Sequence, residues 1–79
     1  MDIQITLNNV DTSTAHDIIA TLDTAMDAAR QAARDEDSKS DYATTEAERL
    51  MHVARSDNHF RLSQALREAA MQTVEQVQA

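Results

Sequence analysis

The fold is decided by residues 15–34, which read AHDIIATLDTAMDAARQAAR. Apolar side chains recur in this stretch every three or four residues, the spacing that places them along one side of an α-helix. The members of this stripe are Ile18, Leu22, Ala25, Ala29 and Ala32, flanked by Ile19, Met26 and Ala33. Residues 11–14, DTST, supply several N-cap candidates just before it. We therefore predict an α-helix over residues 14–35, with an alanine-rich second half that allows close contact with another helix.

Two more helices are predicted after this one. Residues 35–41, DEDSKSD, contain no apolar side chain and indicate a linker or an exposed turn. An apolar stripe resumes in residues 42–56, where Thr45 and Glu48 have the spacing of a capping box. Residues 56–58, SDN, indicate a break before a last helix over residues 58–78. Because the chain has no Gly or Pro, the alternative that these two helices run on as one stays open.

The N-terminal residues follow a different period. From Asp2 to Asn8 apolar and polar residues alternate strictly, which is typical of a half-buried β-strand. Ile3, Ile5 and Leu7 form its apolar side. Because a single strand leaves its backbone edges unpaired, two alternatives are open. The segment is either an extended arm lying across the helices or a strand that pairs with a second copy or with another protein.

Chain size sets the expected assembly. The 79 residues form a single domain, residues 1–79, and much of the apolar content is alanine, so the core is thin. No Cys is present to supplement it with a disulfide, which favours self-association. The predicted fold is mainly α: a short N-terminal β-strand followed by a two- or three-helix antiparallel bundle, assembled as a homodimer. Ile3, Ile5 and Leu7 are the predicted dimerisation residues.

Composition argues against several classes of function. The net charge of −7 opposes direct binding to nucleic acid or to anionic lipid. No apolar run approaches the ~20 residues of a membrane span, and the N-terminus lacks the features of a signal peptide, so the expected location is cytoplasmic. His16, His52 and His59 are scattered and match no metal-binding motif. We therefore predict a protein that is not an enzyme and that uses no cofactor or metal.

One strand followed by two helices, over roughly residues 2–66, resembles the ribbon-helix-helix repressors and antitoxins. The resemblance implies DNA binding by a paired ribbon, with Gln4, Thr6 and Asn8 facing the bases. This strand, however, contains no Lys or Arg, and the first predicted helix is longer than in those folds. A DNA-binding regulator or antitoxin is the alternative function.

Acidic residues in the first half of the chain suggest a different role. Spaced carboxylates can imitate a phosphate backbone and occupy a basic groove, as small acidic inhibitors encoded by phages do, including some that block CRISPR effectors. This chain is similar to them as a class, without a motif that identifies a family. The residues expected to meet such a partner are Asp23, Asp27, Asp35, Glu36 and Asp37. The other interpretation is a solvated helix face, because Asp27 lies three residues before Arg30.

The last predicted helix also has a second, partly apolar side. Phe60, Arg67, Met71 and Val74 lie away from its predicted core face, and exposed apolar patches often mark interaction sites. The commoner fate of such residues is packing against the other helices. The leading prediction is a small acidic, non-enzymatic regulator or inhibitor that binds a protein. Its expected contact residues are the five carboxylates above together with Phe60, Arg67 and Met71. A structural assembly subunit is a third interpretation.

Overall fold

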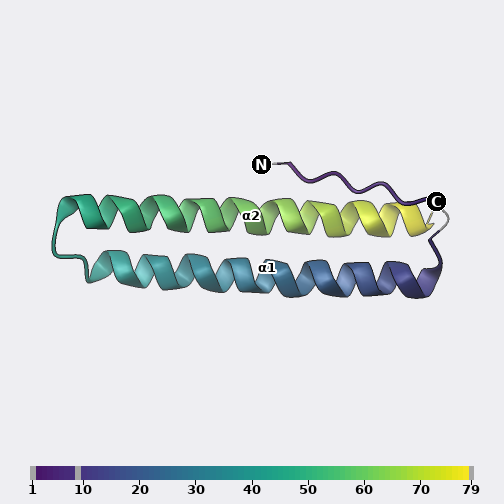
Figure 1. Ribbon diagram of the computed structural model, residues 1–79, viewed down its shortest axis with the longest axis horizontal. Helices are drawn as coiled ribbons and strands as arrows, with labels where there is room; N and C mark the ends of the chain where they lie inside the picture. Colours follow the sequence, from purple (N-terminus) through teal and green to yellow (C-terminus); the bar gives the residue numbers. More distant parts are fainter. Residues whose placement is uncertain (1, 9, 79) are drawn as a thin grey trace.

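The computed structural model describes residues 2–8 and 10–78, and its architecture is a hairpin of two long antiparallel α-helices (Figure 1). Helix α1 spans Thr12–Asp41 and α2 spans Glu46–Gln78. Both run most of the length of the molecule, whose principal extents are 53 × 18 × 13 Å. The prediction of a mainly helical fold is confirmed. Neither helix, in the part of the chain described, is long and apolar enough to cross a bilayer.

Helix α1 begins at a side-chain cap. Asp11 is its N-cap residue, and the Asp11 carboxylate accepts a hydrogen bond of 2.7 Å from the backbone N–H of Thr14. One of the cap candidates in residues 11–14 therefore has the predicted role. This hydrogen bond also lowers the pKa of the Asp11 carboxyl, because it stabilises the charged form.

Helix α1 continues through residues 35–41, so the predicted linker there is wrong. The main contact that keeps this polar segment helical is tertiary, because Glu36 bonds His52 of α2, and local contacts accompany it. Asp35 accepts a hydrogen bond from Gln31 one turn earlier, at 3.0 Å, and the Ser40 hydroxyl donates to the Asp37 carbonyl at 2.7 Å. Lys39 lies in the last turn, where a positive charge interacts favourably with the helix dipole.

Helix α2 is continuous, so the predicted break at residues 56–58 is wrong and the single-helix alternative is correct. Ser56 caps no new helix; its small side chain is buried beside α1. One half of the predicted capping box is present: the Thr45 hydroxyl accepts from the Glu48 N–H at 3.1 Å. The Glu48 carboxylate reaches back to the N–H of Thr44, one residue further than in the usual motif.

The buried layer consists of small side chains. Its members are Ala15, Ala29, Ala33, Ala65 and Ala69, together with Glu36, Ser56, Ser63 and Thr73. Among the described residues, no Leu, Ile, Val, Met or Phe is buried. The Thr73 hydroxyl donates to the Ala69 carbonyl at 2.9 Å, so this buried polar group is satisfied. Small side chains let the helices approach closely and leave the larger apolar residues at the edges of the interface or on the surface.

Residues 2–8, which we call the N-terminal arm, form no β-strand within the described residues, and the chain bends at Asn8. The predicted strand is therefore wrong, and within one chain the segment lies as an arm on α2. The arm lies along α2 on the side away from α1 (Figure 1). Ile3, Ile5 and Leu7 are half-buried, as their alternation indicates, and the polar residues between them are exposed. Dimerisation through this segment stays a prediction.

Two glutamine side chains of α2 take the place of a neighbouring strand. Gln72 accepts a hydrogen bond from the Ile5 N–H at 2.9 Å and donates to the Ile3 carbonyl at 3.3 Å. Gln76 accepts from the Leu7 N–H at 2.7 Å and donates to the Ile5 carbonyl. The two spacings match because four helical residues rise about 6 Å, close to the roughly 6.6 Å spanned by two residues of extended chain.

Candidate functional site

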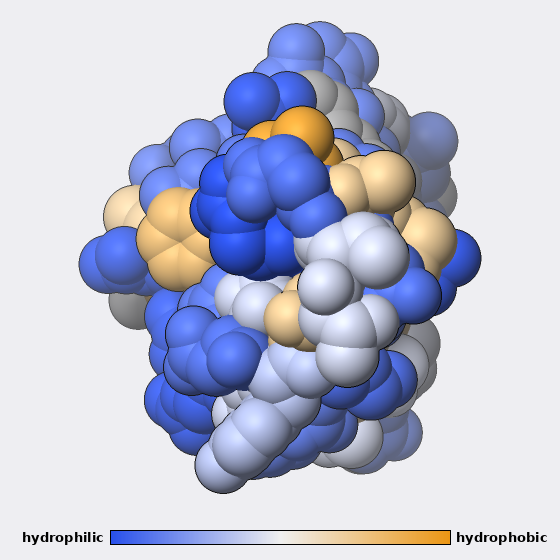
Figure 2. Space-filling view, turned by 90° about the vertical axis from the view of Figure 1, so that its left-hand side faces the viewer, coloured by the Kyte–Doolittle hydropathy of each residue, from blue (hydrophilic) through white to orange (hydrophobic). Residues whose placement is uncertain are grey.

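The large apolar side chains that the buried layer excludes are concentrated on α2. Phe60 and Met71 are each 53% exposed, and Val74 is 37% exposed. Further exposed apolar side chains on the same helix are Leu50, Met51, Val53 and Val77. Figure 2 looks along the molecule onto the turn, and at this end the apolar surface lies mainly in the upper half, over α2. Helix α2 therefore has more apolar surface than its contact with α1 uses.

A groove between the helices has an apolar floor. Met71 and Val74 of α2 border it on one side, and Ile19 and Met26 of α1 border it on the other. Ile19 and Met26 are seven residues apart, a spacing that keeps two side chains on one side of a packed helix. The two helices thus present their edge residues to the same depression.

Charged residues surround this floor. Asp23 and Arg30 come from α1, and Arg67 and Glu75 come from α2. Two acids and two bases give the rim no net formal charge, although the whole chain has a net charge of −7. An apolar floor with a charged rim is the usual composition of a protein-binding surface.

A second hollow lies on the same side of the hairpin and is bordered by Arg30, Arg34 and Asp37 of α1 and by Asp57 and Phe60 of α2. Arg30 borders both hollows, so they form one continuous surface. We call this surface the interhelical groove and define it by Ile19, Asp23, Met26, Arg30, Asp37, Phe60, Arg67, Met71 and Val74.

The groove contains most of the predicted contact residues. Asp23, Arg67 and Met71 border its first hollow, and Asp37 and Phe60 border its second. Sequence reasoning missed the contribution of α1, because it placed Ile19 and Met26 only as flanks of the core stripe and gave Arg30 only a part in local charge cancellation. Their position at the edge of that stripe was the available signal.

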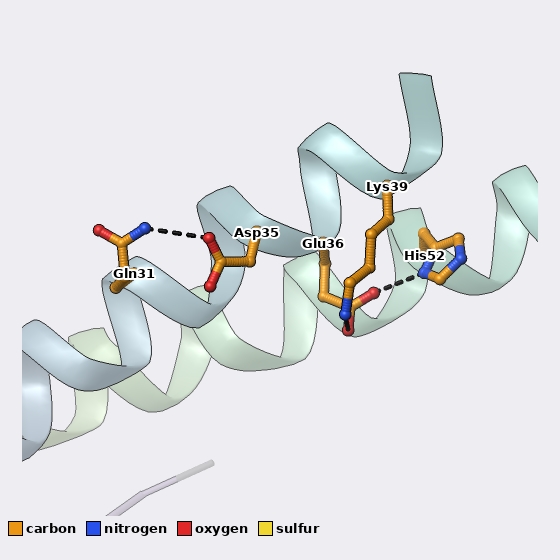
Figure 3. A network of polar contacts seen from close by, with 5 residues as sticks. All are labelled: Gln31, Asp35, Glu36, Lys39 and His52. Carbon is orange, nitrogen blue, oxygen red and sulfur yellow. Dashed lines mark hydrogen bonds and ion pairs between the residues drawn. The ribbon is translucent and has the colours of Figure 1, made fainter. Parts of the chain in front are cut away.

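Asp27 and Asp35 lie outside the groove. Both are exposed on α1, and neither borders the two hollows. The Asp35 carboxylate is engaged by Gln31 (Figure 3). These two residues can meet a partner only on the outer surface of α1.

Glu36 belongs to the helix interface and not to the acidic surface. It is only 8% exposed, and it accepts a hydrogen bond from Nδ1 of His52 at 2.6 Å (Figure 3). That hydrogen bond holds the pKa of the Glu36 carboxyl below its usual value, against the effect of burial, and the charges of Lys39 and Arg55 act in the same direction as the hydrogen bond. Glu36 therefore ties α1 to α2 and offers no free carboxylate to a partner.

The predicted dimerisation residues lie against their own chain. Ile3, Ile5 and Leu7 are half-buried in the arm that Gln72 and Gln76 hold on α2.

Within residues 2–8 and 10–78, no group of three or more His, Asp or Glu side chains is arranged to hold a metal ion.

Comparison of the chain with protein-family models, with curated proteins and with solved structures finds no match. Function is therefore inferred from the groove and from the charge distribution.

Proposed function

We propose that this protein is a non-enzymatic regulator that binds another protein, and that the interhelical groove receives an amphipathic α-helix of that partner. The distribution of apolar side chains supports the proposal. Small residues fill the buried layer, whereas Phe60 and Met71 each keep about half of their surface exposed. Complete burial of such a side chain contributes roughly 1.5–3 kcal/mol, so about 1 kcal/mol from each residue is left for binding.

The shape and chemistry of the groove favour a helix as the bound element. A depression between two helices that run side by side accommodates a third helix. The apolar anchor residues of such a helix recur at positions i, i+3 or i+4, and i+7. Ile19, Met26 and Met71 would meet those apolar anchors. Arg67 and Asp23 on the rim favour a partner with opposite charges at matching positions, which fixes its orientation more than its affinity.

Blockade of a nucleic-acid-handling protein is the most concrete form of this proposal. Asp23, Asp27, Asp35 and Asp37 are all exposed on α1, and they would approach a basic surface as phage-encoded acidic inhibitors do. Such contacts weaken with salt, because exposed charges are screened within about 8 Å at physiological ionic strength. The ribbon-helix-helix alternative gains no support, since the arm contains no Lys or Arg that could approach a phosphate backbone.

A comparison of two double variants tests the groove. The groove variant is Phe60→Ser with Met71→Ser, and the matched control is Leu50→Ser with Met51→Ser, which removes similarly exposed apolar side chains of α2 outside the groove. Each protein is immobilised, and the proteins retained from a lysate of the source cell are compared. We expect a partner that the unaltered chain and the control retain and the groove variant loses. Equal retention by all three would refute the groove as the binding site.

A variant with four carboxylates neutralised tests the inhibitor form separately. It replaces Asp23, Asp27, Asp35 and Asp37 by Asn. If these residues meet a basic surface, partner affinity falls and its salt dependence diminishes, while far-UV circular dichroism stays unchanged. Unchanged affinity at all salt concentrations would remove the acidic contact from the proposal, including Asp23 and Asp37 of the groove, and leave the apolar residues of the groove as the sole site.

A further inference from the structure

The N-terminal arm has one backbone edge bonded to α2 and one edge that faces away. In an extended chain, the N–H and C=O groups of successive residues point to opposite sides. Those of Ile5 bond Gln72 and Gln76. Those of Gln4 and Thr6 therefore point away from α2, and no backbone hydrogen bond among the described residues reaches them. An unpaired edge of this kind is a ready template for another strand.

We propose that this free edge pairs with the same edge of a second copy of the chain, in an antiparallel ribbon with Ile5 at the two-fold axis. This register pairs residues 3–7 of each copy, and the bend at Asn8 ends the ribbon. It places Gln4 opposite Thr6 and Ile3 opposite Leu7 of the other copy. The inference concerns a surface separate from the interhelical groove, so it stands or fails independently of the proposed function.

The side chains of the arm suit this pairing. On the polar face Gln4 comes opposite Thr6, two uncharged side chains, and Asp2, the only acidic residue of the arm, lies beyond the paired residues. On the other face, each copy places Ile3, Ile5 and Leu7 beside the same three residues of its partner. These side chains are only half-buried on their own α2, and a second arm covers the remainder. A second copy is the favoured occupant because both faces are self-complementary.

The position of the arm leaves room for the second copy. In Figure 1 the arm lies at the margin of the molecule, with α2 on one side of it and no other element beyond it. A second hairpin can therefore lie on the far side of the ribbon. The two arms would then be in the middle, with one α2 on each side of them. The glutamine contacts need not change, since they use the opposite edge of the arm.

Thr6→Pro tests the pairing selectively. Proline removes the outward N–H of residue 6 and is compatible with an extended backbone, so the inner hydrogen bonds to Gln72 and Gln76 remain. Thr6→Val is the matched control, because it keeps the N–H. Light scattering on a sizing column should give twice the chain mass for the unaltered protein and the control, and the chain mass for Thr6→Pro.

A hydrogen-exchange measurement completes this test. Retained protection of the Leu7 amide in Thr6→Pro shows that the arm is still docked on α2. A dimer that survives the proline substitution with the arm docked, or an unaltered chain that is monomeric from micromolar to millimolar concentration, would overturn the proposal.

Single cysteine variants test the register, since the natural chain contains no Cys. At the axis, the two copies of residue 5 form a non-hydrogen-bonded pair with Cα atoms about 4.5 Å apart, which a disulfide can span. The two copies of residue 3 are four residues apart along the ribbon, or roughly 13 Å, which is too far. Mild oxidation should therefore cross-link Ile5→Cys and leave Ile3→Cys uncross-linked. Cross-linking of Ile3→Cys, or of neither variant, would refute this register.

Discussion

Replacement of Ala69 by leucine examines whether the small-residue layer determines how the helices pack. Ala69 has no exposed surface, and its carbonyl accepts the hydrogen bond from the buried Thr73 hydroxyl. Leucine adds three carbon atoms at this position, and such overpacking costs about 1–3 kcal/mol. In a domain of this size each 1 kcal/mol lowers Tm by roughly 4–8 °C, so a cost of about 2 kcal/mol predicts a decrease of roughly 8–16 °C.

Ala54→Leu is the control, because Ala54 is exposed on the same helix and leucine has nearly the same helix propensity as alanine. Its effect should stay within about 0.5 kcal/mol. Thermal unfolding followed by far-UV circular dichroism, at one protein concentration, compares the two variants with the unaltered chain. If Ala69→Leu melts at the same temperature as Ala54→Leu or higher, the layer has free space and the packing inferred here is wrong.

Three further predictions follow from individual contacts. Thr45→Ala removes the cap of α2 and should lower the free energy of unfolding, measured by urea unfolding, by about 1 kcal/mol. An unchanged free energy would mean that the cap does not stabilise the helix. Gln76→Leu should abolish hydrogen-exchange protection of the Leu7 amide while the helical amides keep theirs. Persistent protection of Leu7 would show that the Gln76 side chain does not hold the arm. The pKa of Glu36 is held below its usual value in the folded state, so its contribution to stability is complete above about pH 4.5 and is lost as the pH falls through the lower folded pKa. Glu36→Gln should therefore flatten the dependence of Tm on pH below about pH 4.5, and an unaltered slope would show that the contact with His52 does not stabilise the fold.

The helical fold could be predicted from the sequence where the signals are local. Apolar periodicity identifies α1, and the short-range caps at Asp11 and Thr45 locate where both helices begin. The breaks could not be predicted in the same way, because residues 35–41 and Ser56 have poor helix propensity. They are helical because tertiary contacts override that propensity: Glu36 bonds His52 across the hairpin, and Ser56 is buried beside α1.

The candidate site was predictable only in part. Phe60, Arg67 and Met71 lie off the core face of α2 on any helical projection, so periodicity alone identifies them. The opposite wall of the groove depends on which edge of the wide apolar stripe on α1 stays exposed, and that depends on packing. The hydrogen bond between the Leu7 N–H and the Gln76 side chain joins residues 69 positions apart, a separation at which sequence spacing gives no signal.

Site-specific photo-cross-linking examines directly whether the interhelical groove is the protein-binding surface. A photoreactive residue replaces Met71 in the groove or, as the control, Ala28, which is exposed on another surface of α1. Both proteins are irradiated in a lysate of the source cell, and the adducts are identified by mass. If the groove binds a partner, position 71 should give an adduct with one other protein and position 28 should give none. The groove would be excluded as the binding surface by adducts from position 28 alone, by adducts of equal yield from both positions, or by the lack of any adduct from position 71. It would also be excluded if position 71 forms an adduct only with a second copy of this chain.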